Sequence, residues 1–211
     1  MKTQIRRTVL PTVLTLALAS SAFAADSAKQ AAAVKEKIQT VRSESAQVRN
    51  QITLTLEELN RLTVKEVELR PQFEKFTTEL AKMEMQARIA AARADSMKDK
   101  GEAFFAEWEE QVKSIQNEDI RKEAEKRLAK RKKSYGKILS AMVEAKEELV
   151  PFMSDLNDIK KLLDSELTTS SVGATKSLLR TANWHGEDVR ESLMDVEKEL
   201  DRVSAELAKY K

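Results

Sequence analysis

The side chains that could do chemistry in this sequence are few and scattered. The chain has one histidine and no cysteine among its 211 residues. His185 is followed by Glu187, Asp188 and Glu191, which together could supply metal ligands. Zinc sites usually combine several histidine or cysteine ligands at fixed spacing, with a further ligand from another element. We therefore interpret His185 as an ordinary helix residue, and we predict no metal and no cofactor.

The sequence also lacks the patterns of the common catalytic sites. Serines are numerous, but a catalytic triad needs a histidine base near its serine, and no Gly-x-Ser-x-Gly turn is present. Four scattered glycines cannot form a glycine-rich phosphate loop. Without cysteine there is neither thiol chemistry nor a disulfide framework. We expect a protein that is not an enzyme.

The densest cluster of like charge is a basic run from Lys122 to Lys137. Lys130, Lys132 and Lys133 at its centre could contact an anionic surface such as lipid head groups. The other interpretation is a solvated helix face balanced by carboxylates earlier in the chain, between Glu57 and Glu68. We favour this second interpretation, because a highly charged helix exterior is common in long helices.

Residues 1–24 have the composition of a signal peptide. A positively charged start is followed by the apolar run Val9–Leu18 and by Ala22-Phe23-Ala24, which predicts cleavage between Ala24 and Ala25. The apolar run is shorter than the roughly 20 residues that span a bilayer. The Arg6-Arg7 pair also suggests twin-arginine export, but we favour ordinary secretion. We expect a periplasmic or secreted protein without a transmembrane helix in its mature chain.

Removing the signal peptide changes the charge balance. The segment carries three basic residues and no acidic one, so 37 basic residues become 34 against 35 acidic ones. The mature chain is then nearly neutral, with both signs interspersed. That balance does not favour binding of nucleic acid.

A heptad pattern from Val34 to Met97 organises the rest of the chain. Its 19 seam positions follow at steps of four and three, and 16 of them are apolar. Such a period predicts a helix about 100 Å long that buries a narrow stripe against other helices. We place it at residues 30–100, with a kink at Pro71, since proline removes a backbone hydrogen bond. The other interpretation is a corner at Arg70-Pro71 that separates two shorter helices.

Two turns are expected after this helix. Gly101 suits the left-handed residue that follows a helix, and the hydroxyls of Thr168–Ser171 suit a second turn with a helix cap. Further helices are therefore predicted at residues 102–167 and 171–210. Short turns make successive helices antiparallel. The predicted fold is all-α: an elongated antiparallel three-helix coiled-coil bundle over residues 25–211.

Several residues are expected to shape this bundle. Pro151 should kink the second helix, and Asn117 should cap a helix at a small offset within it. Trp108 is expected to fill space beside the Gly101 turn as a core residue. The alanines from Ala87 to Ala94 should let the helices approach closely, making a thin end of the bundle.

From about residue 104 onward the chain resembles a bacterial family of secreted or membrane-associated proteins known as domain of unknown function 2959. The residues that carry the resemblance are Phe105, Trp108, Ile115–Arg121, Tyr135, Met142, Pro151, Leu156–Ile159, Leu162, Leu163 and Leu167. The sequence departs from the family at Asp164–Thr168, where members tend to carry a Lys-His-Asn-Leu-Asn-like string. The resemblance implies a helical fold and no particular mechanism.

These observations favour a non-enzymatic coiled-coil protein of the cell envelope that acts as a scaffold, spacer or interaction module. Its partner would be an envelope protein or a second copy of the chain. Two other hypotheses stay open. One is a periplasmic holdase chaperone, and the other is a peripheral binder of anionic envelope surfaces.

Overall fold

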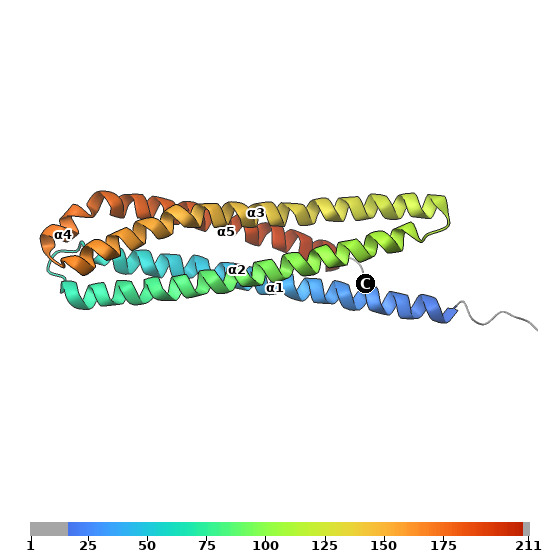
Figure 1. Ribbon diagram of the computed structural model, residues 1–211, viewed down its shortest axis with the longest axis horizontal. Helices are drawn as coiled ribbons and strands as arrows, with labels where there is room; N and C mark the ends of the chain where they lie inside the picture. Colours follow the sequence, from blue (N-terminus) through green and yellow to red (C-terminus); the bar gives the residue numbers. More distant parts are fainter. Residues whose placement is uncertain (1–16, 209–211) are drawn as a thin grey trace, which may run out of the picture.

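The computed structural model describes residues 17–208, and the side chains of residues 32–205 within them. Four long helices, α1 (Ala17–Arg61), α2 (Leu69–Lys113), α3 (Glu118–Ser165) and α5 (Lys176–Ala208), lie side by side along one axis (Figure 1). A short helix, α4 (Thr169–Ala174), forms the turn between α3 and α5. The predicted all-α bundle is confirmed, but the bundle has four long helices where three were predicted.

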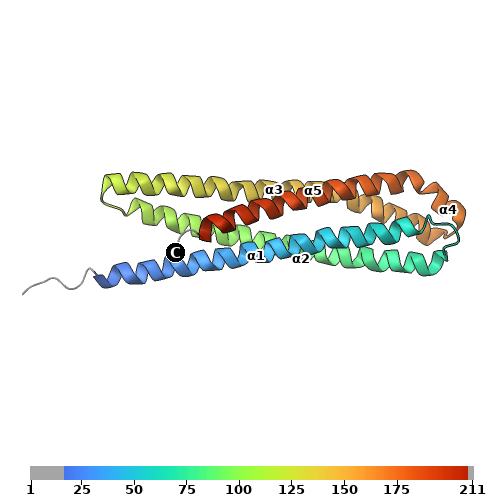
Figure 2. The same cartoon turned by 180° about the vertical axis from the view of Figure 1, so that it is seen from behind.

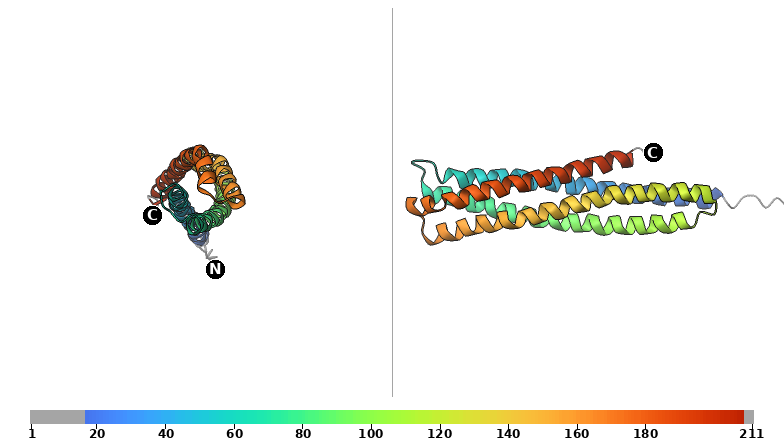
Figure 3. Two further views of the ribbon diagram at one scale, coloured as in Figure 1. Left: turned by 90° about the vertical axis from the view of Figure 1, so that its left-hand side faces the viewer. Right: turned by 90° about the horizontal axis from the view of Figure 1, so that it is seen from above.

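The helices run up, down, up and down around the bundle. α1 packs against α2 and α5, and α3 packs against the same two helices, so every neighbouring pair is antiparallel. Viewed from the end, the four helices surround a common axis (Figure 3). α5 stops short of the end where α2 turns into α3 (Figure 2).

The prediction of one helix over residues 30–100 is wrong, because the chain reverses between Arg61 and Leu69. Pro71 lies in the first turn of α2, where the missing backbone N–H has no helical partner to lose. A helix through this segment would press the proline ring against the carbonyl of Val67. Glu66 in the connection has a φ of 64°, which helical backbone excludes.

The heptad pattern could not reveal this reversal. Seven residues connect the last residue of α1 to the first of α2, so the connection adds one whole heptad to the count. Leu62, the first residue of the connection, and Leu69, the first residue of α2, therefore have the same heptad register. The pattern continues even though the chain has changed direction.

The first predicted turn at Gly101 is also wrong. Gly101 is buried inside α2, and a Cβ on it would lie 2.2 Å from the hydroxyl oxygen of Tyr135. The missing side chain lets the Tyr135 ring approach α2, where its hydroxyl donates to the Met97 carbonyl at 2.8 Å. Gly101 serves close packing between α2 and α3 rather than a turn.

The turn occurs at residues 114–117 instead, so the second helix does not begin at residue 102. The side chain of Asn117 accepts hydrogen bonds from the backbone N–H groups of Asp119 and Ile120, both at 3.1 Å. This N-cap starts α3 as predicted. The Thr168 hydroxyl likewise accepts from the Ser171 N–H at 3.1 Å, which confirms the predicted cap after α3. Pro151 lies inside α3, as expected.

Two glutamine side chains fix the pairing of α1 with α2. Gln51 donates to both the backbone carbonyl (3.1 Å) and the carboxylate (2.7 Å) of Glu79. Gln72 of α2 donates in the same way to the carbonyl and carboxylate of Glu58, both at 2.8 Å. Each bond crosses between the helices, so sliding one helix by a turn would break both pairs.

The core consists of two clusters separated along the bundle. One contains Phe76 and Phe152 near the α4 end, and the other contains Ile38 and Ile138 towards the α2–α3 turn. Between Met83 and Met97, a stretch that the structure describes in full, no α2 residue is buried. We call this region between the two clusters the waist.

Most of the predicted signal peptide, residues 1–16, lies outside the described residues. Ala24 and Ala25 lie within α1, in the part where only the backbone is described. Cleavage between them stays a prediction. Among the described helices, none combines the length and the apolar character needed to cross a membrane.

Candidate ligand-binding groove at the waist

A cavity of about 440 Å³ lies at the waist. All four long helices line it, and most of its lining is apolar. α2 contributes four alanines to its wall: Ala87, Ala90, Ala91 and Ala94. We call this cavity the waist groove.

The groove opens between α2 and α3. Its residues on α1 and α5, such as Val48 and Val189, are buried, whereas Ala91 on α2 and Val143 on α3 are exposed. α2 and α3 are also the least closely packed pair of neighbouring long helices. The floor of the groove therefore reaches the bundle axis, and its mouth faces solvent.

The packing on either side of the waist explains why the groove exists. Phe76 and Phe152 fill the bundle on one side, and Tyr135 and Met97 fill it on the other. These large side chains set the distance between the helices. Alanines on α2 are too small to fill the space left at that distance, so a cavity remains at Ala87–Ala94, where a close approach of the helices was expected. The alanines lie at mid-bundle and not at a thin end.

Polar groups are placed at two depths in the groove. Ser45 is only 5% exposed, and its hydroxyl forms no hydrogen bond to any residue that the structure describes. Lys98 of α2, Lys146 of α3 and Asp95 of α2 lie at the exposed rim. None of these three charged side chains is in an ion pair with the described part of the chain.

The predicted basic cluster lies elsewhere, on the N-terminal half of α3. Lys132 pairs with Glu109 of α2, and Arg127 pairs with Glu123 one turn away at 3.4 Å. Lys130 and Lys133 are exposed, and their contact with an anionic surface stays a prediction.

The carboxylates between Glu57 and Glu68 lie at the opposite end of the bundle (Figure 1). The interpretation that they balance the basic run is wrong. The balancing carboxylates that the structure shows lie within α3 and on α2, as in the pair between Lys122 and Glu118 at 2.8 Å.

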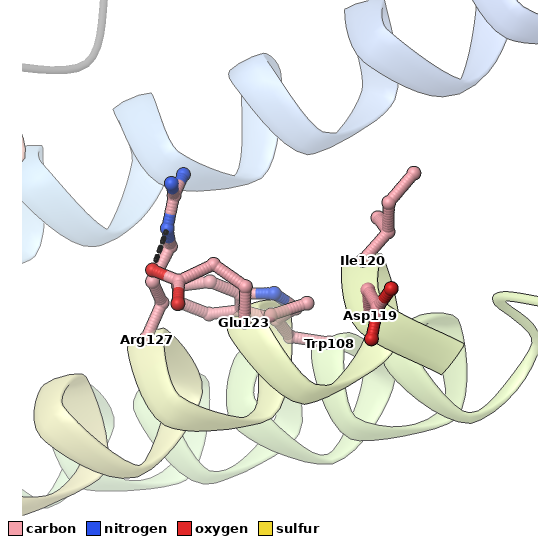
Figure 4. A pocket seen from close by; sticks show the side chains of 6 residues that line it. Trp108, Asp119, Ile120, Glu123 and Arg127 are labelled. Atoms are coloured by element: carbon pink, nitrogen blue, oxygen red, sulfur yellow. Dashed lines mark hydrogen bonds and ion pairs between the residues drawn. The ribbon is translucent and has the colours of Figure 1, made fainter. Parts of the chain in front are cut away.

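A shallow hollow lies at the end of the bundle where α2 turns into α3 (Figure 4). Trp108 lines it together with Ile120, whose side chain is 60% exposed. Trp108 also stacks on Phe105, with ring centroids 6.3 Å apart. Trp108 is half-buried and not a core residue, and the turn expected beside it at Gly101 does not exist.

His185 is placed within the bundle, as its interpretation as a helix residue implies. Its Nδ1 atom lies 2.8 Å from a carboxylate oxygen of Asp155 on α3. In the part of the chain that the structure describes, no group of three potential metal ligands is gathered.

Sequence analysis missed the waist groove. The only signal of it was the run of alanines at the heptad seam, which has two opposite structural meanings. Small residues bring helices together when the core side chains one turn above and below them are also small. They leave a gap when the core side chains on both sides are large. The sequence alone did not show which core side chains of α3 and α5 lie beside the alanines.

The fold and the groove define an all-α helical-bundle protein. The family described as Protein of unknown function (DUF2959) matches residues 24–208 of the chain, so the chain belongs to this family. The resemblance seen in the sequence is thereby confirmed. No curated protein and no solved structure is similar enough to the chain to count as a match.

Proposed function

We propose that the protein is an exported, non-enzymatic binding module of the cell envelope, and that the waist groove is its binding site. The observation that carries this proposal is an apolar groove that reaches the bundle axis and contains the unpartnered hydroxyl of Ser45. Ligand sites in proteins are typically concave and mostly apolar, with a few polar groups that orient the ligand. The signal-like composition of residues 1–24 supports export.

An uncharged apolar dye, N-phenylnaphthylamine, tests whether the groove binds apolar molecules at all. In the filled variant, Ala90→Leu with Ala94→Leu, two larger side chains occupy the groove. In the control variant, Ala81→Leu with Ala92→Leu, the same changes are made at exposed α2 positions outside it. Both pairs change the same residue type on the same helix.

The proposal predicts one dye molecule per wild-type chain, with fluorescence that the filled variant loses and the control variant keeps. Circular dichroism checks that both variants stay helical. Dye binding that is equal in the two variants would show that the groove is not the site.

The two other functions predicted from the sequence stay hypotheses. A holdase chaperone would suppress aggregation of an unfolded client protein. A peripheral binder would attach to anionic vesicles in a manner that salt weakens and that reversing the charge of Lys130, Lys132 and Lys133 abolishes. Neither has a specific feature of the structure that favours it over the groove.

A further inference from the structure

We infer that the waist groove takes the hydrocarbon chain of an anionic amphiphile, such as a long-chain carboxylate, with the charged head between Lys98 and Lys146. This inference rests on the proposed function, because it names the ligand of the same site. It follows from the size of the groove, the depth at which its polar groups lie, and the charges on its rim.

The size of the groove favours a narrow, unbranched ligand. Its volume of about 440 Å³ lies within the roughly 300–1,000 Å³ typical of small-molecule sites. A helix with its side chains is about 10 Å across, so a partner helix would need a wider opening than an unbranched hydrocarbon chain. The groove therefore favours a hydrocarbon chain over a partner helix.

The lining suits a hydrocarbon chain along its whole depth. The floor is made by valines that are buried, among them Val48, Val189 and Val196. The larger and more flexible side chains of Met142 and Leu193 complete the walls. Burying methylene groups against such a surface is favourable by about 0.8 kcal/mol for each group.

The rim supplies charge where the head of the ligand would lie. Lys98 on α2 and Lys146 on α3 face the mouth from its two sides, and both are exposed. The one carboxylate in the lining is Asp95, so the lining has a net positive charge. Glu144 and Glu147 line a neighbouring hollow on the outside of α3 and not the groove. An anionic head is therefore favoured over a cationic one.

Ser45 gives the groove a polar group at its floor. The residue is only 5% exposed, and its hydroxyl forms no hydrogen bond to a residue that the structure describes. A hydroxyl or a double bond along the ligand chain could approach it. Replacing Ser45 with alanine should thus change the preference among ligands and leave the helix intact.

The test is calorimetric titration of the full chain with decanoate, dodecanoate, tetradecanoate and hexadecanoate below their micellar concentrations. We expect one ligand per chain and an affinity that rises about fourfold for each added methylene until the groove is full. The filled variant should lose at least tenfold in affinity, and the control variant should match the wild type.

Head-group specificity is tested with the alcohol and the trimethylammonium ligand of the same chain length. Replacing Lys98 and Lys146 with glutamine should weaken carboxylate binding by up to about fivefold for each lysine, because exposed charge pairs contribute at most about 1 kcal/mol. The same replacements should leave binding of the alcohol unchanged.

Failure of the inference can be told apart from failure of the proposed function. If the uncharged dye binds the groove but carboxylates do not displace it, the inference is overturned and the binding function stands. Displacement by an amphipathic peptide and not by carboxylates would have the same meaning. Equal affinity for the carboxylate and the trimethylammonium ligand would overturn the role of the two lysines. If neither dye nor carboxylate binds, the proposed function itself fails.

Discussion

Gly101 offers the sharpest test of how α2 packs against α3. In the structure it lies within a continuous helix, so alanine at this position should gain about 1 kcal/mol from helix propensity alone. Against this gain stands the steric conflict with Tyr135, whose Oη and Cζ atoms would lie 2.2 Å and 2.3 Å from the new Cβ. Real Cβ atoms do not approach other atoms so closely, so the ring must move.

Moving the Tyr135 ring has two consequences. The ring is only 5% exposed, and overpacking at such a site costs about 1–3 kcal/mol. Its hydrogen bond to the Met97 carbonyl, which contributes about 1 kcal/mol, is also lost. Gly101→Ala should therefore lower the free energy of unfolding by about 1–3 kcal/mol despite the better helix propensity.

Gly136 provides a matched control on the facing helix. It lies next to Tyr135 in α3, and apart from its chain neighbours and the backbone of its own helix, no atom lies within 4 Å of the place that a Cβ would take. Gly136→Ala should therefore stabilise the protein by about 1 kcal/mol. Urea unfolding followed by circular dichroism measures both variants, and the difference between them should be about 2–4 kcal/mol.

A double variant separates steric conflict from any other effect. In a Tyr135→Ala background the space next to Gly101 is empty, so adding Gly101→Ala should be stabilising rather than destabilising. Equal stability of the Gly101→Ala and Gly136→Ala variants would refute the packing of Tyr135 on α2. So would a Gly101→Ala effect that persists unchanged without the Tyr135 ring.

Three further predictions concern single side chains. Burial raises the pKa of Tyr135 above its ordinary value of 10.0, so the contribution of the neutral phenol to stability is complete below about pH 10 and declines as pH rises further. Tyr135→Phe should remove this loss of stability at alkaline pH, which is measured as the urea midpoint of unfolding over a series of pH values. Hydrogen bonds from Lys82 and from Gln51 lower the pKa of Glu79 below 4.5, so its stabilising effect is present above about pH 4.5 and is lost as pH falls through the lowered value. Glu79→Gln should reduce the loss of stability at acid pH in the same series of urea midpoints. An unchanged loss of stability at acid pH would contradict this role of Glu79. Asn117→Ala removes the cap of α3 and should reduce the free energy of unfolding by about 1 kcal/mol, whereas no change would show that the cap contributes nothing.

The sequence predicted the helical class and the caps because these depend on local chemistry. The hydroxyl of Thr168 and the side chain of Asn117 can cap a helix only through neighbouring backbone groups, so their roles are visible within a few residues. The absence of sheet-forming composition and the length of the heptad pattern likewise required an all-α bundle.

The number of helices could not be predicted in the same way. The connection between α1 and α2 has the length of one heptad, so the seam from Leu62 to Leu69 is unbroken although the chain reverses. Gly101 was equally ambiguous, since glycine suits both a turn and a close contact. Only the position of the Tyr135 ring, some 34 residues later in the chain, decides between these two roles.

The most direct test of the central claim is native mass spectrometry of the full chain with hexadecanoate. The measurement compares the wild type with the filled variant (Ala90→Leu with Ala94→Leu) and the control variant (Ala81→Leu with Ala92→Leu). We predict one bound hexadecanoate on the wild type and on the control variant, and none on the filled variant at the same ligand concentration. Binding at the same stoichiometry to all three proteins would contradict a ligand site at the waist of the bundle, and binding to none of them would contradict a hydrocarbon-chain ligand.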